Sequence, residues 1–184
     1  MKIVFMLEEY SMKCVLDELL PRILPEGIFF ETIPHNGKID LRRSLPRKLR
    51  GWNEPGVRFV VLQDQDDSDC HKVKNELATI CANAGRNDTL VRIVCHELEA
   101  WYFGDIQALA KAYPDSISIS LAEKESYRVP DNIRDCKERL IKLIPTHGQI
   151  SGAKRIAPLM EIEQNTSASF QCFVRGVRQL VASG

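Results

Sequence analysis

Several features are missing from this sequence, and each absence narrows the kind of protein it encodes. The charges cancel, because 25 basic and 25 acidic side chains leave no net charge at pH 7. A protein that binds nucleic acid alone is usually basic overall, so this balance counts against that role. A local basic groove, or a subunit held on nucleic acid by a partner, stays open. No apolar run reaches the roughly 18 residues that span a bilayer, and we expect no membrane contact.

An export signal and a cysteine framework are missing as well. The first ten residues, MKIVFMLEEY, turn acidic after one short apolar run, whereas a signal peptide has a longer apolar region and a small-residue cleavage site. The cysteines include no CxxC pair; they are Cys14, Cys70, Cys81, Cys95, Cys136 and Cys172. We therefore expect reduced thiols and a cytoplasmic location.

Short apolar runs alternate with amphipathic segments over the first 112 residues. The runs are residues 2–7, 27–33, 59–62 and 89–95. Alternation of this kind predicts an α/β fold with a mainly parallel sheet of about four strands, flanked by helices. Because 44% of the 184 residues are hydrophobic, we expect one domain over residues 1–184, with its core at about 1–112.

The pattern changes after residue 112. Residues 113–130 weaken into a loop, and helices then fit 131–144 and 167–181. We expect these helices to form a helical C-terminal extension at about 131–184. The last helix has one apolar stripe, made of Phe170, Phe173, Val174, Val177, Leu180 and Val181. Such a stripe indicates packing against the core or an interface.

Several helix starts can be read from capping residues. Ser11 can cap the helix after the first strand, and Asp67 or Ser68 can cap the helix after the third. The basic segment 40–52 is also expected to be helical, although Pro46 interrupts it.

Three of the four expected strands are followed by acidic side chains. These are Glu8 and Glu9, then Asp64 and Asp66, then Glu97 and Glu99. The carboxyl ends of parallel strands share one edge of the sheet, where ligands bind. Crowded carboxylates repel one another unless they are protonated or neutralised by a cation. Because oxygen ligands of this kind suit Mg²⁺ or Mn²⁺, the sequence predicts a divalent metal site at this edge.

The D-x-D motif has a structural interpretation as well. Aspartates after a strand commonly cap helices, and Asp67 and Asp69 fit that role or face solvent. The position of Asp64 and Asp66 behind an apolar strand, matched by a glutamate after the first strand, favours the metal site. Of the two glutamates after the fourth strand, Glu97 is nearer the strand end and is the preferred ligand.

Soft ligands offer a second interpretation of the same edge. Cys70–His71 and Cys95–His96 follow two of the strands and could meet in space. Structural zinc sites usually have C-x₂₋₄-C or H-x₃₋₅-H spacing, which is missing, so zinc is less favoured than magnesium. A thiol–histidine nucleophilic pair lacks an identifiable third orienting group. Buried cysteines near strand ends are the simpler interpretation.

Basic residues elsewhere could contact phosphate. Lys154 follows Ser151 and Gly152, which could open a helix whose amides and lysine hold a phosphate. Residues 42–50 include five basic side chains: Arg42, Arg43, Arg47, Lys48 and Arg50. They could bind phosphates or a partner, but a solvated helix face is the commoner role of such a run.

Five blocks of this sequence resemble an uncharacterised bacterial family, domain of unknown function 4276. They are VFMLEEYSMKCVLDELLPRILP, FVVLQDQDDSDC, VRIVCHELEAWYFGD, ISGAKRIAP and NTSASFQCFVRGVRQL. That family is regarded as Toprim-like, akin to the catalytic fold of topoisomerases, primases and the overcoming-lysogenization-defect nucleases. The resemblance implies a small α/β domain with an acidic site that binds Mg²⁺.

The resemblance also implies which carboxylates matter. Glu8, Asp64 and Asp66 match the Toprim pattern of a glutamate after the first strand and a D-x-D after the third. Toprim glutamates are often followed by glycine, whereas Glu9 and Tyr10 follow here. This departure leaves the choice between Glu8 and Glu9 open.

The leading hypothesis is a Mg²⁺-dependent nuclease that hydrolyses phosphodiesters of DNA or RNA. Asp64 and Asp66 would hold one or two ions of Mg²⁺ or Mn²⁺, with Glu97 as a further ligand. Glu8 would complete the metal shell or take a proton from the attacking water, and Lys154 would balance charge on the phosphate. By analogy with relatives of this fold, the chain would be the effector subunit of an ATPase-associated anti-phage defence system.

Two other functions compete with this hypothesis. The chain could be a non-catalytic metal-binding or assembly subunit that partners an ATPase and holds a structural cation or a partner's basic surface. It could also hydrolyse nucleotides or other small phosphate esters. A homo-oligomer is open in every case.

Overall fold

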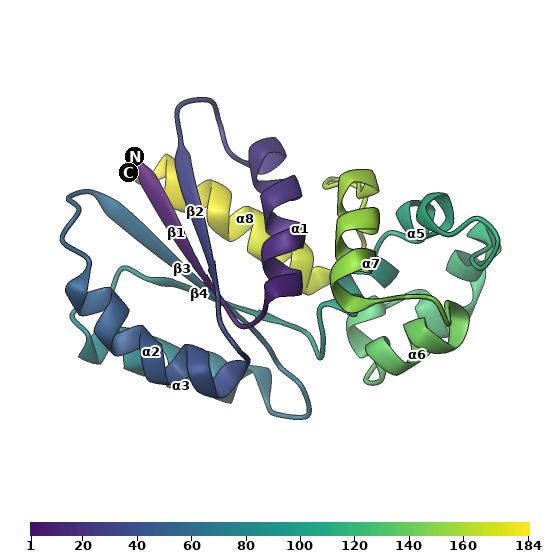
Figure 1. Ribbon diagram of the computed structural model, residues 1–184, viewed down its shortest axis with the longest axis horizontal. Coiled ribbons are helices and arrows are strands. Elements are labelled where there is room, and N and C mark those ends of the chain that lie inside the picture. The colour runs from purple at the N-terminus through teal and green to yellow at the C-terminus, as the bar shows by residue number, and fades with distance from the viewer.

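A four-stranded parallel sheet forms the centre of the protein, in a computed structural model that describes residues 1–184 (Figure 1). The strand order is β2-β1-β3-β4, and every neighbouring pair is parallel. The strands are β1 (Lys2–Leu7), β2 (Phe29–Pro34), β3 (Val57–Asp64) and β4 (Leu90–Val94). The prediction of a four-stranded parallel sheet flanked by helices is therefore confirmed.

The two central strands are apolar on both faces because helices cover both sides of the sheet. In β1, the residues from Ile3 to Leu7 are fully buried. Ile3 and Phe5 belong to the larger of two hydrophobic clusters, whereas Val4 and Met6 belong to the smaller one. This alternation follows from the two-residue period of a strand, and it explains why the sequence of β1 is continuously hydrophobic.

Two helices cover each face of the sheet. On one face lie α1 (Tyr10–Ile23) and α8 (Ala168–Ala182), and on the other lie α2 (Lys38–Gly51) and α3 (Cys70–Asn83) (Figure 1). The apolar stripe of α8 packs into the larger cluster, where the Trp101 ring stands 5.0 Å from the Phe170 ring and 5.3 Å from the Phe173 ring. The stripe predicted for the last helix is thus core packing.

The remaining helices form a helical lobe, residues 99–159, beyond the carboxyl ends of the strands (Figure 1). Its helices are α4 (Glu99–Phe103), α5 (Ile106–Ala112), α6 (Cys136–Leu143) and α7 (Gln149–Ile156). Four short 3₁₀ turns connect them: η1 (Ile119–Glu123), η2 (Glu125–Tyr127), η3 (Pro130–Asn132) and η4 (Ala157–Leu159). The larger hydrophobic cluster runs continuously from β1 into this lobe, so both parts share one core.

Several predicted boundaries differ from the structure. The cap of α3 is Asp69, whose side chain accepts a hydrogen bond from the Lys72 amide, as the capping interpretation of the aspartates predicts; Asp67 and Ser68 do not have that role. Ser11 lies inside α1, where its hydroxyl donates to the Glu9 carboxylate instead of capping the helix.

The connecting segments also differ from the prediction. Residues 113–130, expected as a loop, include the 3₁₀ turns η1 and η2, and α6 begins at Cys136 rather than at residue 131. The helix α2 continues through Pro46 without a break. No helix is long and apolar enough to traverse a lipid bilayer.

Candidate functional site

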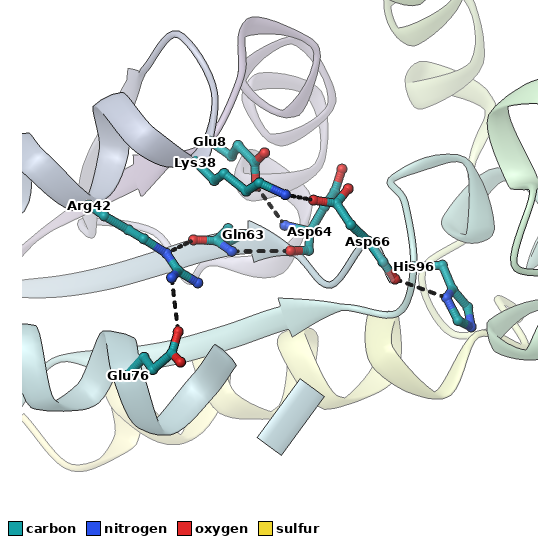
Figure 2. Close-up of polar contacts among 8 residues, drawn as sticks. All are labelled: Glu8, Lys38, Arg42, Gln63, Asp64, Asp66, Glu76 and His96. Carbon is teal, nitrogen blue, oxygen red and sulfur yellow. Dashed lines mark hydrogen bonds and ion pairs between the residues drawn. The ribbon is translucent and has the colours of Figure 1, made fainter. Parts of the chain in front are cut away.

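Glu8 and Asp64 lie next to each other where the two central strands end. In the parallel register Leu7 pairs with Leu62; Glu8 directly follows Leu7, and Asp64, the last residue of β3, is two residues beyond Leu62. The Asp64 amide donates a hydrogen bond to Glu8 Oε2 at 3.0 Å (Figure 2), while the Glu8 amide donates to the Leu62 carbonyl at 3.2 Å. The predicted meeting of these two carboxylates at one edge of the sheet is what the structure shows.

Asp66 is placed by a turn that links the ends of β3 and β4. Both Asp66 and His96 have positive φ, at 52° and 55° respectively, which is uncommon for residues other than glycine. The Asp66 amide donates to the His96 carbonyl at 2.8 Å, and His96 Nδ1 stands 3.3 Å from the Asp66 carbonyl (Figure 2). These reciprocal contacts hold the turn and carry the Asp66 carboxylate to the same edge as Glu8 and Asp64.

A lysine from the neighbouring helix pairs with Asp66. Lys38 is the first residue of α2, and its Nζ lies 2.7 Å from Asp66 Oδ2. The preceding residue, Gly37, has a φ of 85° that favours glycine, and its amide donates to the Glu8 carbonyl at 2.9 Å. The start of α2 is therefore fixed to the end of β1, which sets Lys38 among the carboxylates.

Arg42 organises the next layer of contacts, one helical turn further along α2. Its guanidinium donates to Gln63 Oε1 and to Glu76 Oε2, each at 2.9 Å. Gln63 in turn donates to the Asp64 carbonyl at 3.3 Å (Figure 2). Because Gln63 is buried, this chain of hydrogen bonds fixes the backbone that presents the D-x-D motif.

The electrostatics of this edge favour a bound cation. Asp64 is buried, and its Oδ1 has no hydrogen-bond partner. Burial, followed by repulsion between carboxylates, raises the pKa of Asp64 well above its ordinary value. The repelling neighbours are Glu8, Glu9, Glu99 and Asp66. Burial likewise raises the pKa of Glu8 to about 7. A buried carboxylate oxygen without a donor is costly for the fold, and a divalent cation would satisfy it.

Glu99 and Tyr102 extend the site toward the helical lobe. Glu99 is 3% exposed, and burial raises its pKa to about 7. The Tyr102 hydroxyl is buried without a hydrogen-bond partner, and burial followed by repulsion from Glu99 raises its pKa well above the ordinary value. Glu9 lies at the same junction, because its Oε2 accepts a hydrogen bond from Gln149 Nε2 of α7 at 2.6 Å. Tyr102 belongs to no motif that predicts this position from the sequence.

The predicted ligand Glu97 has a different partner from the other carboxylates. Its Oε2 accepts a hydrogen bond from the Lys137 amide at the start of α6, at 2.8 Å. Glu99, in contrast, contributes to the repulsion that raises the pKa of Asp64. Of the two glutamates after β4, the structure therefore brings Glu99 into the electrostatic field of Asp64.

Lys154 lies outside this network, and of the two cysteine–histidine pairs only His96 takes part in it. Lys154 is exposed on α7, and its charge acts on the Cys14 thiol of α1. Burial raises the pKa of Cys95 to about 11, which opposes the formation of a nucleophilic thiolate at neutral pH. His96 is engaged with the Asp66 carbonyl, as described above.

The donor set suits magnesium or manganese better than zinc. The acidic side chains at the edge of the sheet offer only oxygen, and no three His, Cys, Asp or Glu side chains are arranged as a ready cage for a metal ion. Mg²⁺ keeps several of its waters and usually binds proteins through one or two carboxylates, so it does not need such a cage. The unpartnered Asp64 oxygen, with Asp66 two residues away, fits that requirement.

Comparisons with known proteins agree with this architecture. The model of the family described as "Domain of unknown function (DUF4276)" matches residues 7–178. The C-terminal region of the Burkholderia pseudomallei OLD protein superposes with a TM-score of 0.53 and 19% identity, over 98% of each chain. At this identity the likeness shows the fold alone, a parallel sheet flanked by helices.

A second solved structure is similar over most of its length. The C-terminal region of the Xanthomonas campestris pv. campestris OLD protein, phased with mercury, has a TM-score of 0.48 and 17% identity, over 98% of this chain and 96% of that one. No curated protein matches the chain.

Proposed function

Because this chain belongs to the family described as domain of unknown function (DUF4276), with its Toprim-like fold, we propose that it is a Mg²⁺-dependent nuclease. It hydrolyses phosphodiester bonds in DNA or RNA. The observation that carries the proposal is Asp64, a buried carboxylate with an unpartnered oxygen between Glu8 and Asp66 at the ligand-binding edge of a parallel sheet. An arrangement so unfavourable to the metal-free fold is best explained by a cation that binds there.

Asp64 and Asp66 are the proposed metal ligands, and either Mg²⁺ or Mn²⁺ suits them. When bound, the ion polarises the phosphate and stabilises the leaving oxygen. Glu99 is a better candidate than Glu97 for a further ligand, because it is buried on the Asp64 side of the lobe. The hydrogen-bond chain from Arg42 through Gln63 to the Asp64 backbone keeps the two aspartates in place.

Glu8 is proposed to complete the metal shell or to accept the proton of the attacking water. A general base works best when its pKa is near the working pH, and burial raises the pKa of Glu8 to about 7. Lys154 lies on α7, which packs against α1, and is proposed to contact a phosphate of the substrate from that side. The helical lobe would then cover one side of the bound nucleic acid.

We also propose that the chain is a cytoplasmic effector subunit that works beside an ATPase in defence against phage. The fold supports this, because the solved structure it resembles is the C-terminal region of a protein and therefore adjoins another part. The neutral net charge is consistent with a partner that supplies much of the affinity for nucleic acid.

The test is cleavage of plasmid, single-stranded DNA and total tRNA by the purified chain, in Mg²⁺, in Mn²⁺ and in EDTA. Asp64→Asn keeps the shape of the side chain while removing its charge, and Asp115→Asn makes the same change at an exposed position of the lobe. We expect metal-dependent cleavage by the wild-type chain and by Asp115→Asn, and none by Asp64→Asn. Equal cleavage by all three proteins would exclude the proposed site.

The same experiment separates the nuclease from a non-catalytic metal-binding subunit. Thermal unfolding of the wild-type chain is recorded with and without Mg²⁺ alongside the cleavage assay. If Mg²⁺ raises the melting temperature of the wild-type chain but not of Asp64→Asn, and no substrate is cleaved, the site binds metal for assembly. That result would reject the nuclease function in favour of a non-catalytic metal-binding subunit.

A further inference from the structure

Lys38 is held beside the D-x-D motif by the backbone. Three amides anchor the segment before it: His35 donates to the Leu7 carbonyl at 2.9 Å, Gly37 to the Glu8 carbonyl at 2.9 Å, and Asn36 to Asp40 Oδ2 at 3.1 Å. The first two of these acceptors belong to the end of β1. The backbone of Lys38 is therefore fixed at the carboxylate edge, even though half of its side chain is exposed.

The ammonium of Lys38 pairs with Asp66, one of the two proposed metal ligands. Its Nζ lies 2.7 Å from Asp66 Oδ2, so one oxygen of a proposed metal ligand already has a cationic partner (Figure 2). Lys38 also stabilises the charged form of Glu8, which places its charge within reach of a second carboxylate of the site. One ammonium thus neutralises part of the acidic edge from within the chain.

The surroundings give Lys38 room to leave this position. A hollow of about 230 Å³ opens between α2 and α3, and Lys38, Arg42 and Asp66 line it. Arg42 is held by Gln63 and Glu76, so it does not compete with Lys38 for Asp66. The lysine can swing into the hollow without breaking the contacts that fix the D-x-D backbone.

We propose that Lys38 is a resident counter-ion that competes with the divalent cation for Asp66 and thereby sets the affinity of the site for metal. The proposal rests on the proposed metal-dependent function. In the metal-free protein the lysine offsets the repulsion among the carboxylates. When Mg²⁺ or Mn²⁺ binds Asp66, the ammonium has to withdraw, because two cations repel each other across one carboxylate.

The size of the effect follows from the exposure of the pair. An ion pair between partly exposed side chains contributes modestly to stability. Removal of the Lys38 charge, which competes with the metal for Asp66, should therefore tighten metal binding by about 3- to 5-fold. The same removal leaves Asp66 and Glu8 without their cation when metal is absent. The metal-free protein should then be less stable, whereas the metal-bound protein should not be.

The experiment is a titration of Mn²⁺, followed by electron paramagnetic resonance of the free ion, with no nucleic acid present. The variants are Lys38→Met, which removes the charge, and Lys38→Arg, which keeps it. The matched control is Lys2→Met, because Lys2 also pairs with carboxylates, Glu31 and Glu54, but lies at the opposite end of β1. Thermal unfolding of each protein in EDTA and in saturating Mn²⁺ is the second readout.

We expect Lys38→Met to bind Mn²⁺ about 3- to 5-fold more tightly than the wild-type chain, with Lys38→Arg and Lys2→Met within about two-fold of it. Lys38→Met should lower the melting temperature in EDTA but not in saturating Mn²⁺. If the wild-type chain binds Mn²⁺ and Lys38→Met binds it equally or more weakly, the counter-ion proposal is wrong and the metal site stands. If the wild-type chain binds no Mn²⁺, both proposals fall.

Discussion

Replacement of Glu8 by glutamine should stabilise the metal-free protein, but only at pH values above the pKa of Glu8 in the unfolded chain. Burial raises the pKa of Glu8 from 4.5 to about 7, so the folded state resists its ionisation. A group with a raised folded pKa contributes stability below its unfolded pKa and loses that contribution as the pH rises through the folded pKa. The wild-type chain should therefore lose more stability than Glu8→Gln between about pH 4.5 and pH 7. Both proteins keep the raised pKa values of Glu99 and Asp64, so the difference between them reports Glu8 alone.

The magnitude follows from the size of that pKa difference. At roughly 1.4 kcal/mol for each pKa unit, the rise from 4.5 to about 7 corresponds to about 3 kcal/mol. Glu8 is only partly buried, and solvent screening reduces this to about 2 kcal/mol. For a chain of 184 residues, that gain corresponds to a melting temperature higher by roughly 4–8 °C at pH 8. The glutamine oxygen can still accept the hydrogen bond that the Asp64 amide donates to Glu8.

The assay is thermal unfolding in EDTA at pH 5 and at pH 8, for the wild-type chain and for Glu8→Gln. At pH 5 the two proteins should melt at nearly the same temperature, because Glu8 is protonated in the folded wild-type chain. Glu138→Gln is the control, since Glu138 is largely exposed on α6 and should show no pH-dependent gain. A variant that melts below the wild-type chain at pH 8, or gains equally at both pH values, would refute the reasoning.

Three further predictions concern the site and the core. The affinity for Mn²⁺ should increase as the pH is raised through about 7. Burial raises the pKa of Glu8 and Glu99 to about 7, and both must lose a proton to bind metal. Isothermal titration between pH 6 and pH 8 checks this, and an affinity that does not change with pH would contradict it. Phe173→Ala should lower the free energy of unfolding by about 3–5 kcal/mol in urea titrations, because the ring is fully buried in the larger cluster. Gly104→Ala should destabilise the fold by about 2 kcal/mol in the same assay, because a β-carbon there meets the Asn165 amide oxygen, and equal stability would show that Asn165 can move aside.

Much of the fold can be predicted from the sequence because the strongest signals are local. The apolar runs of β1 and β3 are buried on both faces, and helices cover each face, so the continuous hydrophobicity reports a parallel sheet directly. The turns of the helical lobe are harder to predict. Residues 113–130 include the short 3₁₀ turns η1 and η2, in which Leu121 belongs to the larger cluster and Tyr127 packs against it, and such turns lack a strong periodic pattern.

Some features of the site can likewise be predicted from local sequence, whereas others depend on tertiary contacts. Glu8 and Asp64 stand at the carboxyl ends of apolar strands, so their presence at one edge of the sheet can be predicted once the strands are taken to be parallel. The pairing of Lys38 with Asp66 depends on how α2 crosses the sheet edge, for which nearby residues give no signal. Proximity to the strand end favours Glu97, but the turn at His96 has a positive φ and redirects the chain, so Glu99 is the glutamate on the Asp64 side.

The strand order has a consequence for the synthesis of this protein. The segment that becomes β1 is made before the other three strands, yet it forms the inside of the sheet between β2 and β3. Until residues 57–64 have left the ribosome, a continuously hydrophobic strand has only one of its two neighbours. Exposed strands of this kind aggregate readily in nascent chains. Slower synthesis at low temperature, or a chaperone that shields the first segment, should therefore improve the yield of folded protein.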